Sequence, residues 1–153
     1  MRTIEQRDHP VIRPLEEVTV RDLMHTGVFH CPPETPLKVV ARIMSLNKIH
    51  SVVVFGDPAN YNDERAWRIV SDVDLVGLAL SGSVSRTAGD AATGEVLTVV
   101  PSDLIAHAAK VMSGNGTSHV VVVDEASNHP VGVLSTLDIA AALAWSPSIS
   151  SKV

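Results

Sequence analysis

The chain has 153 residues, of which 45% are hydrophobic, 19% charged and 3% aromatic, and its net charge is −5. This length suffices for one ordinary domain or two very small ones with an aliphatic core. The longest apolar run, 139–145, is too short to span a bilayer, residues 1–8 hold no apolar signal segment, and the single cysteine, Cys31, excludes an internal disulfide. We expect a soluble, cytoplasmic protein.

The charge distribution argues against nucleic acid and against a membrane surface as partners. Residues 1–68 carry nine basic and nine acidic groups, whereas residues 69–153 carry three basic and eight acidic groups. A protein that neutralises phosphates needs a basic stripe, and the sequence has none. The expected partner is a small molecule, another protein, or both.

In chain order, the first half predicts a strand, a helix, two strands and a second helix. The β-branched stretch 28–31 ends at a proline, as a short strand does. Thr35 as N-cap and Pro36 as first helical residue predict a helix start. Apolar residues then follow at i, i+3, i+4 and i+7 of the helix: Leu37, Val40, Ala41 and Met44. The remaining predicted elements are strand 52–55, covered on both faces, strand 67–70 and helix 71–79.

The second half predicts the same order. Its elements are strand 96–100, a helix capped by Asp103, strands 120–123 and 131–134, and helix 135–145. The apolar face of its first helix is Ile105, Ala108, Ala109 and Met112. The first half differs by a longer connection, 56–68, which bears Tyr61 and Trp67. We expect this connection to be an ordinary long hairpin or to reach over a cleft or a dimer surface.

An internal repeat explains this parallel. A shift of 68 residues aligns 19–55 on 87–123 with 11 identities in 37 positions, and a shift of 64 then pairs Ser71 with Ser135 and Asp74 with Asp138. The fold class is therefore α/β, with tandem βαββα repeats. Each half, at about 60 residues, is too small to cover its sheet alone, so the two are expected to pack together. The expected organisation is an extension at 1–17, repeats at 18–82 and 83–145, and a tail at 146–153.

Five segments of this doubled unit carry a family resemblance: 20–24, 35–41, 49–54, 67–75 and 131–139. The last two each place a hydrophobic strand before the pattern Ser/Thr-x-x-Asp-aliphatic. With these segments the chain resembles, over about 18–145, the cystathionine-β-synthase-type (CBS) domain pair, also called the Bateman module. The resemblance implies two βαββα units packed as a pseudo-twofold pair, with adenine nucleotides or related adenosyl compounds bound in clefts between the repeats.

The chemistry of the repeated pattern supports such a ligand. Ser71 and Ser135 precede helices whose free N–H groups suit a phosphate, and each hydroxyl can donate to the same phosphate. Asp74 and Asp138 follow one helical turn later, where a carboxylate can accept bonds from both ribose hydroxyls. The alternative interpretation is structural, because the same residues can cap helices and interact favourably with the helix dipole.

The resemblance also implies the rest of each site. Each cleft would join the Ser/Asp pair of one repeat to the segment before the second strand of the other, with adenine read near the first strand. These further residues are Ile49, His50 and Ser51, Thr117, Ser118 and His119, Phe29 and His30, and Leu97 and Thr98. His50 or His119 is a candidate phosphate contact or, alternatively, a polar residue at a strand entry.

Three departures from the family pattern leave open which cleft, if either, binds tightly. The first repeat has Arg68 at the position of the family's glycine, which the second repeat keeps as Gly132. The second strands have Val53 and Val121 in place of the family's proline. The glycine-rich segment 114–118 weakens the end of the first helix of the second repeat. Few cations lie in the second half to hold a polyphosphate. Among AMP, ADP, ATP, NAD and S-adenosylmethionine, we therefore expect a monophosphate or an adenosyl compound with an uncharged tail.

Catalysis and metal binding find little support in the sequence. His30 and Cys31 are adjacent on a strand and point to opposite faces, and His25, His30 and Cys31 show no recognised ligand spacing. We expect a non-enzymatic regulatory module, without a required cofactor, that acts on a partner protein or through its own homodimer. The alternative is a ligand-free dimerisation or docking module.

Overall fold

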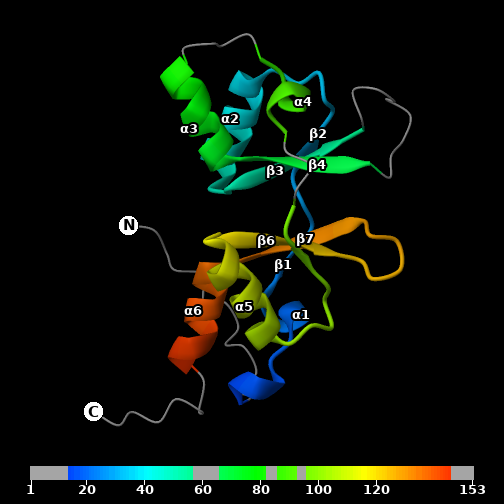
Figure 1. The fold of residues 1–153 in the computed structure, drawn as a ribbon, viewed down its shortest axis with the longest axis vertical. Coiled ribbons are helices and arrows are strands. Elements are labelled where there is room, and N and C mark those ends of the chain that lie inside the picture. Colours follow the sequence, from blue (N-terminus) through cyan, green and yellow to red (C-terminus); the bar gives the residue numbers. More distant parts are fainter. Residues whose placement is uncertain (1–13, 57–65, 82–85, 93–95, 146–153) are drawn as a thin grey trace. The chain divides into compact units, whose positions relative to one another are not determined.

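The computed structural model describes residues 14–56, 66–81, 86–92 and 96–145, and Figure 1 shows its elements. In chain order these are η1 (Leu15–Glu17, a 3-10 helix), α1 (Val20–Leu23), β1 (His25–Thr26), β2 (His30–Cys31), α2 (Leu37–Asn47), β3 (Ser51–Phe55), β4 (Trp67–Ser71), α3 (Asp72–Ser81), α4 (Ala88–Ala91), β5 (Thr98–Val99), α5 (Ile105–Asn115), β6 (His119–Val123), β7 (Pro130–Ser135) and α6 (Thr136–Trp145). The order confirms the tandem βαββα repeat. Among the described residues, no helix combines the length and the apolar character needed to cross a bilayer.

The described residues form two compact units that do not coincide with the two repeats. One unit lies within 27–96, in the middle of the sequence, and we call it the central unit. The other combines 14–26 with 97–145, and we call it the terminal unit. Each unit has its own sheet and its own hydrophobic core.

The central unit has a three-stranded sheet in the order β2-β3-β4. Strand β2 is parallel to β3, and β4 is antiparallel to β3, so that Ser51 lies opposite Ser71. Helices α2 and α3 lie on the same side of this sheet (Figure 1). The core contains three of the four residues predicted for the apolar face of the first helix, Leu37, Val40 and Met44, buried against strand valines and Ala88 of α4. The fourth, Ala41, is only partly buried.

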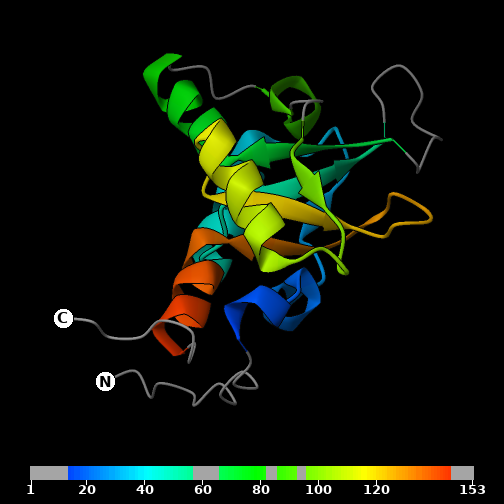
Figure 2. The same cartoon turned by 60° about the horizontal axis from the view of Figure 1, so that its bottom comes forward.

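The terminal unit has a four-stranded sheet in the order β1-β7-β6-β5. Strand β5 is parallel to β6, whereas β7 is antiparallel to both β6 and β1. Figure 2 shows the short helix α1 beside α6, with which it is in contact. The core again contains three residues of the predicted face, Ile105, Ala108 and Met112, together with Val18 and Val20 from the segment before β1. Ala109, the fourth, is only partly buried.

Each unit contains a segment that precedes the first strand of the other repeat, and we call these the exchanged segments: 14–26 in the terminal unit and 86–92 in the central unit. Val20 N donates to Asp103 O (2.8 Å) and Arg21 N to Pro101 O (3.0 Å) in the terminal unit. At positions 68 residues later and earlier, Ala88 N donates to Thr35 O (2.7 Å) and Gly89 N to Pro33 O (2.8 Å) in the central unit. Each repeat therefore supplies a short helix to the unit that holds the βαββα core of the other repeat.

This exchange also corrects the predicted helix starts. Thr35 and Asp103 were expected to cap the first helix of each repeat, but the N-cap residues are Pro36 and Leu104, without a side-chain cap bond. Asp103 Oδ2 instead accepts from Val100 N at 2.9 Å. The free helix-end N–H groups bond to the exchanged segments, because Leu37 N donates to Arg86 O and Ile105 N to Val18 O.

The long connection of the first repeat starts and ends as an antiparallel hairpin. Phe55 lies opposite Trp67, and Gly56 N donates to Ala66 O at 2.9 Å. Tyr61 and the remainder of the connection, 57–65, lie outside the described residues. Whether this connection covers a cleft or a dimer surface therefore stays a prediction.

Candidate functional site

The first Ser-x-x-Asp motif forms a reciprocal hydrogen-bonded cap where β4 meets α3. Asp74 Oδ2 accepts from Ser71 N (2.7 Å) and from the Ser71 hydroxyl (3.0 Å), and Ser71 Oγ accepts from Asp74 N (3.3 Å). This is a capping box, which satisfies otherwise free N–H groups at a helix start. Asp74 Oδ1 has no hydrogen-bond partner among the described residues.

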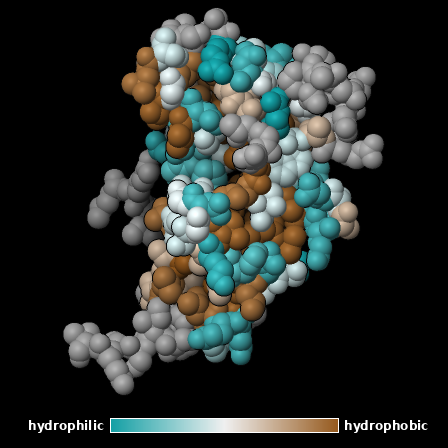
Figure 3. Space-filling model, in the orientation of Figure 1, coloured by the Kyte–Doolittle hydropathy of each residue, from teal (hydrophilic) through white to brown (hydrophobic). Residues whose placement is uncertain are grey.

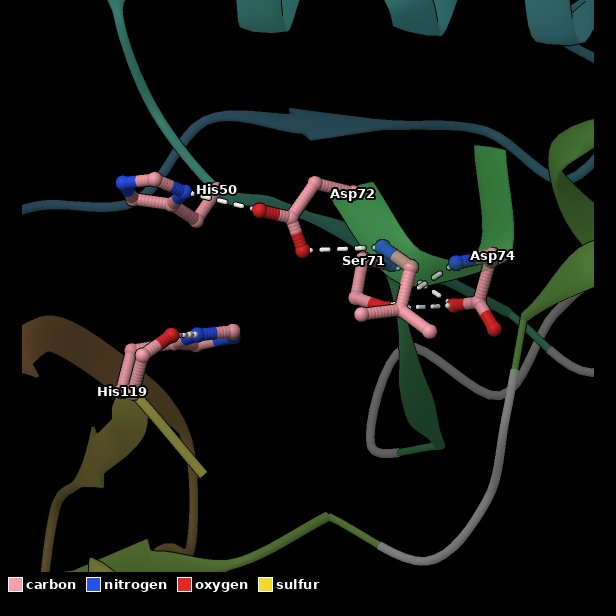
Figure 4. A network of polar contacts seen from close by, with 7 residues as sticks. His50, Ser71, Asp72, Asp74 and His119 are labelled. Atoms are coloured by element: carbon pink, nitrogen blue, oxygen red, sulfur yellow. Dashed lines mark hydrogen bonds and ion pairs between the residues drawn. The ribbon is translucent and has the colours of Figure 1, made fainter. Parts of the chain in front are cut away.

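A second carboxylate lies at the same helix start. Asp72, the first residue of α3, bonds through Oδ2 to His50 Nδ1 at 2.8 Å, and Asp72 N donates to His50 O at 2.9 Å. Figure 4 shows His50, Asp72, Ser71 and Asp74 around this strand-to-helix junction. The His50 and Asp72 side chains are both about half exposed. The junction thus holds two carboxylates and one imidazole that is already paired.

The second motif repeats the capping box where β7 meets α6. Asp138 Oδ2 accepts from Ser135 N (2.8 Å) and from the Ser135 hydroxyl (3.0 Å), and Ser135 Oγ accepts from Asp138 N (3.4 Å). The position equivalent to Asp72 is Thr136, so this helix start has one carboxylate fewer. Here the other oxygen, Asp138 Oδ1, lies 2.9 Å from His25 Nε2 of β1.

The other predicted site residues divide evenly between the two units. Phe29, His30, Ile49, His50 and Ser51 belong to the central unit, with the motif Ser71/Asp74. Ser51 is buried opposite Ser71, the half-exposed Phe29 accepts from Val53 N through its carbonyl (2.8 Å), and the His30 ring lies edge-on to the Phe55 ring. These residues line the same sheet as the motif.

The terminal unit holds the matching set beside Ser135 and Asp138: Leu97, Thr98, Thr117, Ser118 and His119. His119 lies opposite Ser135, and Leu97 O accepts from Val121 N at 3.1 Å. The Thr117 hydroxyl donates to His119 O (3.0 Å), and Ser118 Oγ lies 3.4 Å from His119 Nδ1. The implied pairing of each motif with the strand entry of the other repeat stays a prediction.

Sequence reasoning missed two residues that act on these motifs. His25 is adjacent to no motif in sequence, and only the pairing of β1 with β7 brings it to Asp138. Asp72 was detectable, because an acidic residue directly after the motif serine adds charge to the same helix start.

The departure at Arg68 from the family's glycine has a structural explanation. Gly132 is required in the terminal unit, because a Cβ there would lie 2.5 Å from His25 O of β1. In the central unit the Arg68 guanidinium instead donates to Ala92 O (3.2 Å) and Gly89 O (3.3 Å) at the end of α4. Arginine thus anchors a short exchanged helix in one unit, whereas glycine admits an extra strand in the other.

Comparison with known proteins identifies the family. The model of the CBS domain matches residues 20–81 and 88–144, so the chain belongs to the CBS domain family as a tandem pair. A search of the curated proteins finds no match.

Solved structures with the same fold include several CBS domain pairs. The CBS domain protein PAE2072 from Pyrobaculum aerophilum, complexed with AMP, has a TM-score of 0.68 and 23% identity, covering 79% of this chain and 89% of that chain. The CBS domain pair of protein MJ0100, in complex with 5′-methylthioadenosine and S-adenosyl-L-methionine, has a TM-score of 0.69 and 19% identity, covering 80% and 97%. CBSX2 in complex with AMP has a TM-score of 0.68 and 23% identity, covering 82% and 96%.

Proposed function

We propose that this chain is a cytoplasmic, non-enzymatic regulatory module that senses an adenosine-containing small molecule through its Ser-x-x-Asp motifs. It would pass the signal to a partner protein or through its own homodimer. The observation that carries the proposal is the duplicated Ser-Asp capping box at equivalent strand-to-helix junctions, where no described residue bonds to Asp74 Oδ1. AMP, 5′-methylthioadenosine and S-adenosyl-L-methionine in structurally similar CBS proteins support the ligand class.

The capping geometry is compatible with ligand binding. The capping box uses one oxygen of Asp74, and a carboxylate has about four lone-pair sites, so Oδ1 can still accept from a ribose hydroxyl. The box also fixes the orientation of that carboxylate, which reduces the side-chain entropy lost on binding. The capping and binding interpretations of the motif are therefore complementary.

The charges at the start of α3 favour a ligand with little negative charge. Asp72 and Asp74 lie within the first turn, and the nearby His50 already bonds to Asp72. Anionic side chains use the favourable field at a helix N-terminus that a phosphate would otherwise use. We propose that the first motif prefers an adenosyl compound with an uncharged tail, or a monophosphate, over ATP.

A thermal-shift titration tests the proposal against AMP, ADP, ATP, NAD and S-adenosylmethionine. A ligand at 100 times its Kd adds about 2.7 kcal/mol to the stability of the folded state, which is visible as a higher Tm. The test variant is Asp74→Ala with Asp138→Ala, which is expected to lose the ligand-induced shift. No shift from any compound at millimolar concentration in the parent chain would contradict the proposal.

The matched control removes capping boxes outside the motifs. Because Asp74 and Asp138 both cap helices, their loss lowers stability by about 1 kcal/mol per cap even without a ligand. Asp22→Ala with Asp90→Ala removes two capping boxes of the same type, at α1 and α4. This control is expected to lower the Tm of the free protein while keeping the ligand-induced shift.

The homodimer forms part of the same proposal, and an apolar stripe on α3 supports it. Val73, Val76 and Leu80 lie at i, i+3 and i+7 and are 73%, 60% and 86% exposed, and α3 has no buried residue. Figure 3 shows hydrophobic surface over this helix. A second copy is the proposed occupant, with helices facing each other.

Light scattering tests the dimer directly. The expected mass is twice the 16.3 kDa of one chain. Val76→Lys with Leu80→Lys is expected to give monomers, whereas Leu46→Lys, at an exposed position of α2, is expected to leave the dimer intact. A monomeric parent chain at micromolar concentration would contradict this part of the proposal.

The same stripe favours the second candidate function, a ligand-free dimerisation or docking module. In that case the Ser-Asp capping boxes serve stability alone. The two functions are distinguished by the titration, because a docking module forms the dimer without any ligand-induced shift.

A further inference from the structure

The two Ser-x-x-Asp motifs differ in one hydrogen bond. Asp74 Oδ1 has no partner among the described residues, whereas Asp138 Oδ1 is 2.9 Å from His25 Nε2. Both oxygens of Asp138 are therefore engaged, one by Ser135 and one by His25. The Asp138 side chain is 7% exposed, and the His25 side chain is 55% exposed.

The exchanged segment holds His25 in this place. His25 pairs with Val133 in the antiparallel contact of β1 with β7, and Gly132 leaves room for the His25 carbonyl. Just before β1, the Thr19–Asp22 capping box starts the short helix α1, which contacts α6. The segment that carries His25 therefore packs against β7 and α6, the strand and the helix that the second motif joins.

The bond matters because of what the second motif would have to do. If a ribose binds through Asp138, both of its hydroxyls must donate to Oδ1, where His25 already occupies one of the two lone-pair sites. The bond between His25 and Asp138 joins a carboxylate to a nitrogen donor, and such charged hydrogen bonds are stronger than neutral ones. To bind through both ribose hydroxyls, a ligand at this motif must replace that bond, and a ligand at Asp74 need not.

We propose that His25 blocks the second motif from within the chain and makes the first motif the stronger ligand site. This inference rests on the proposed function, because it ranks the two sites for the same adenosine-containing ligand. Loading of the second motif breaks the contact of His25 with Asp138 and loosens β1. Occupancy of Asp138 is thereby coupled to the exchanged segment, 14–26.

The test isolates the second motif. In the full chain carrying Asp74→Ala, the affinity for adenosine and for AMP is measured by calorimetry with and without His25→Ala. Removal of the imidazole is expected to raise the affinity about 10- to 100-fold, the value of one charged hydrogen bond. Asp138→Ala, added to this pair, is expected to abolish the gain.

Two further variants separate blocking from a general loss of structure. In the Asp74→Ala chain, His25→Gln keeps a side-chain N–H donor and is expected to bind as weakly as Asp74→Ala alone. His107→Ala removes an imidazole that is likewise half exposed but lies on α5, 4.0 Å from Asp103, and is expected to change nothing. Hydrogen exchange of the full chain gives an independent readout, because saturating adenosine is expected to speed exchange at Thr26.

The outcomes distinguish this inference from the proposed function. If the parent chain binds adenosine through Asp74 but His25→Ala gains no affinity, or loses some, the inference is wrong and the proposed function stands. Unchanged exchange at Thr26 with both motifs saturated would also overturn it. If no variant binds either probe at millimolar concentration, the proposed function fails and the ranking of sites fails with it.

Discussion

At the scale of single residues, the two repeats use different amino acids for the same backbone conformation. Helices α2 and α5 both have 11 residues and both end at a left-handed residue, Lys48 with φ 55° and Gly116 with φ 61°. Glycine adopts this conformation without strain, whereas a residue with a Cβ does not. The glycines at 114–116 of the second repeat therefore include one that suits the helix end.

Lys48→Gly is expected to stabilise the protein by about 0.5–1 kcal/mol. Relief of roughly 1–2 kcal/mol of left-handed strain exceeds the roughly 0.5–1 kcal/mol of extra chain entropy that glycine loses on folding. Urea denaturation measures the change. Gly116→Lys provides the mirror control and is expected to destabilise, since no atom lies within 4 Å of its Cβ position and backbone strain alone acts there.

Asp90 provides a pH-dependent contribution to stability. Hydrogen bonds from the Thr87 backbone N–H and, second, from its side chain lower the pKa of Asp90 below its ordinary value of 3.8. Because the folded pKa is depressed, the unfolded chain binds the proton more readily. This contribution is therefore present above about pH 4 and is lost as the pH falls through the folded pKa.

Asp90→Asn is accordingly expected to make the stability less steeply dependent on pH below about pH 4. Unfolding by urea at a series of pH values measures the slope, and a carboxyl NMR titration of Asp90 measures the pKa directly. An NMR midpoint at or above 3.8 would show that the cap does not act on this group.

At the scale of elements, most of each repeat could be predicted and the exchanged segments could not. The apolar spacing of Leu37, Val40 and Met44 identified a buried helix face because periodicity is local. The first strands were predicted at 28–31 and 96–100, but only His30–Cys31 and Thr98–Val99 form ladders. Strand extent depends on which partner residues are present, and local sequence does not contain that information.

The identities Thr19/Thr87 and Asp22/Asp90 had a local meaning that was missed, since both pairs form capping boxes. Where the capped helices dock was beyond sequence reasoning, because the contacts join residues about 80 positions apart, such as Val20 with Asp103. For the same reason the interaction of His25 with Asp138, 113 residues away, had no signal in the sequence. The Ser-x-x-Asp motifs themselves were readable because each lies within one helical turn.

The pairing of β1 with β7 gives a test at this scale. Gly132→Ala places a Cβ 2.5 Å from His25 O, so β1 must move, and the protein is expected to lose about 1–3 kcal/mol. Gly77→Ala, in α3 with no atom within 4 Å of its Cβ, is the matched control and is expected to gain about 0.5–1 kcal/mol. Thermal unfolding followed by circular dichroism compares the two, and equal effects would show that β1 is not held at this position.

At the scale of the whole molecule, the units that fold together differ from the repeats that align. The fragment 27–96 contains every buried core residue of the central unit, including Ala88 of α4. A fragment cut at the repeat boundaries, 18–82, lacks α4 and the Arg86 carbonyl that accepts from Leu37 N. Fragment 27–96 is expected to unfold cooperatively on heating, and 18–82 is not. Equal cooperativity of the two fragments would mean that the exchange does not contribute to folding.

The exchange also sets an order of events during synthesis on the ribosome. All residues of the central unit have been made once residue 96 is added. Residues 14–26 are made before the central unit, but they find their partners only in 97–145, which are added after it. At the usual 5–20 residues per second they wait roughly 4 to 24 seconds for those partners. During that interval Val18 and Val20 lack their core partners, so the nascent chain presents an apolar segment that a chaperone can bind.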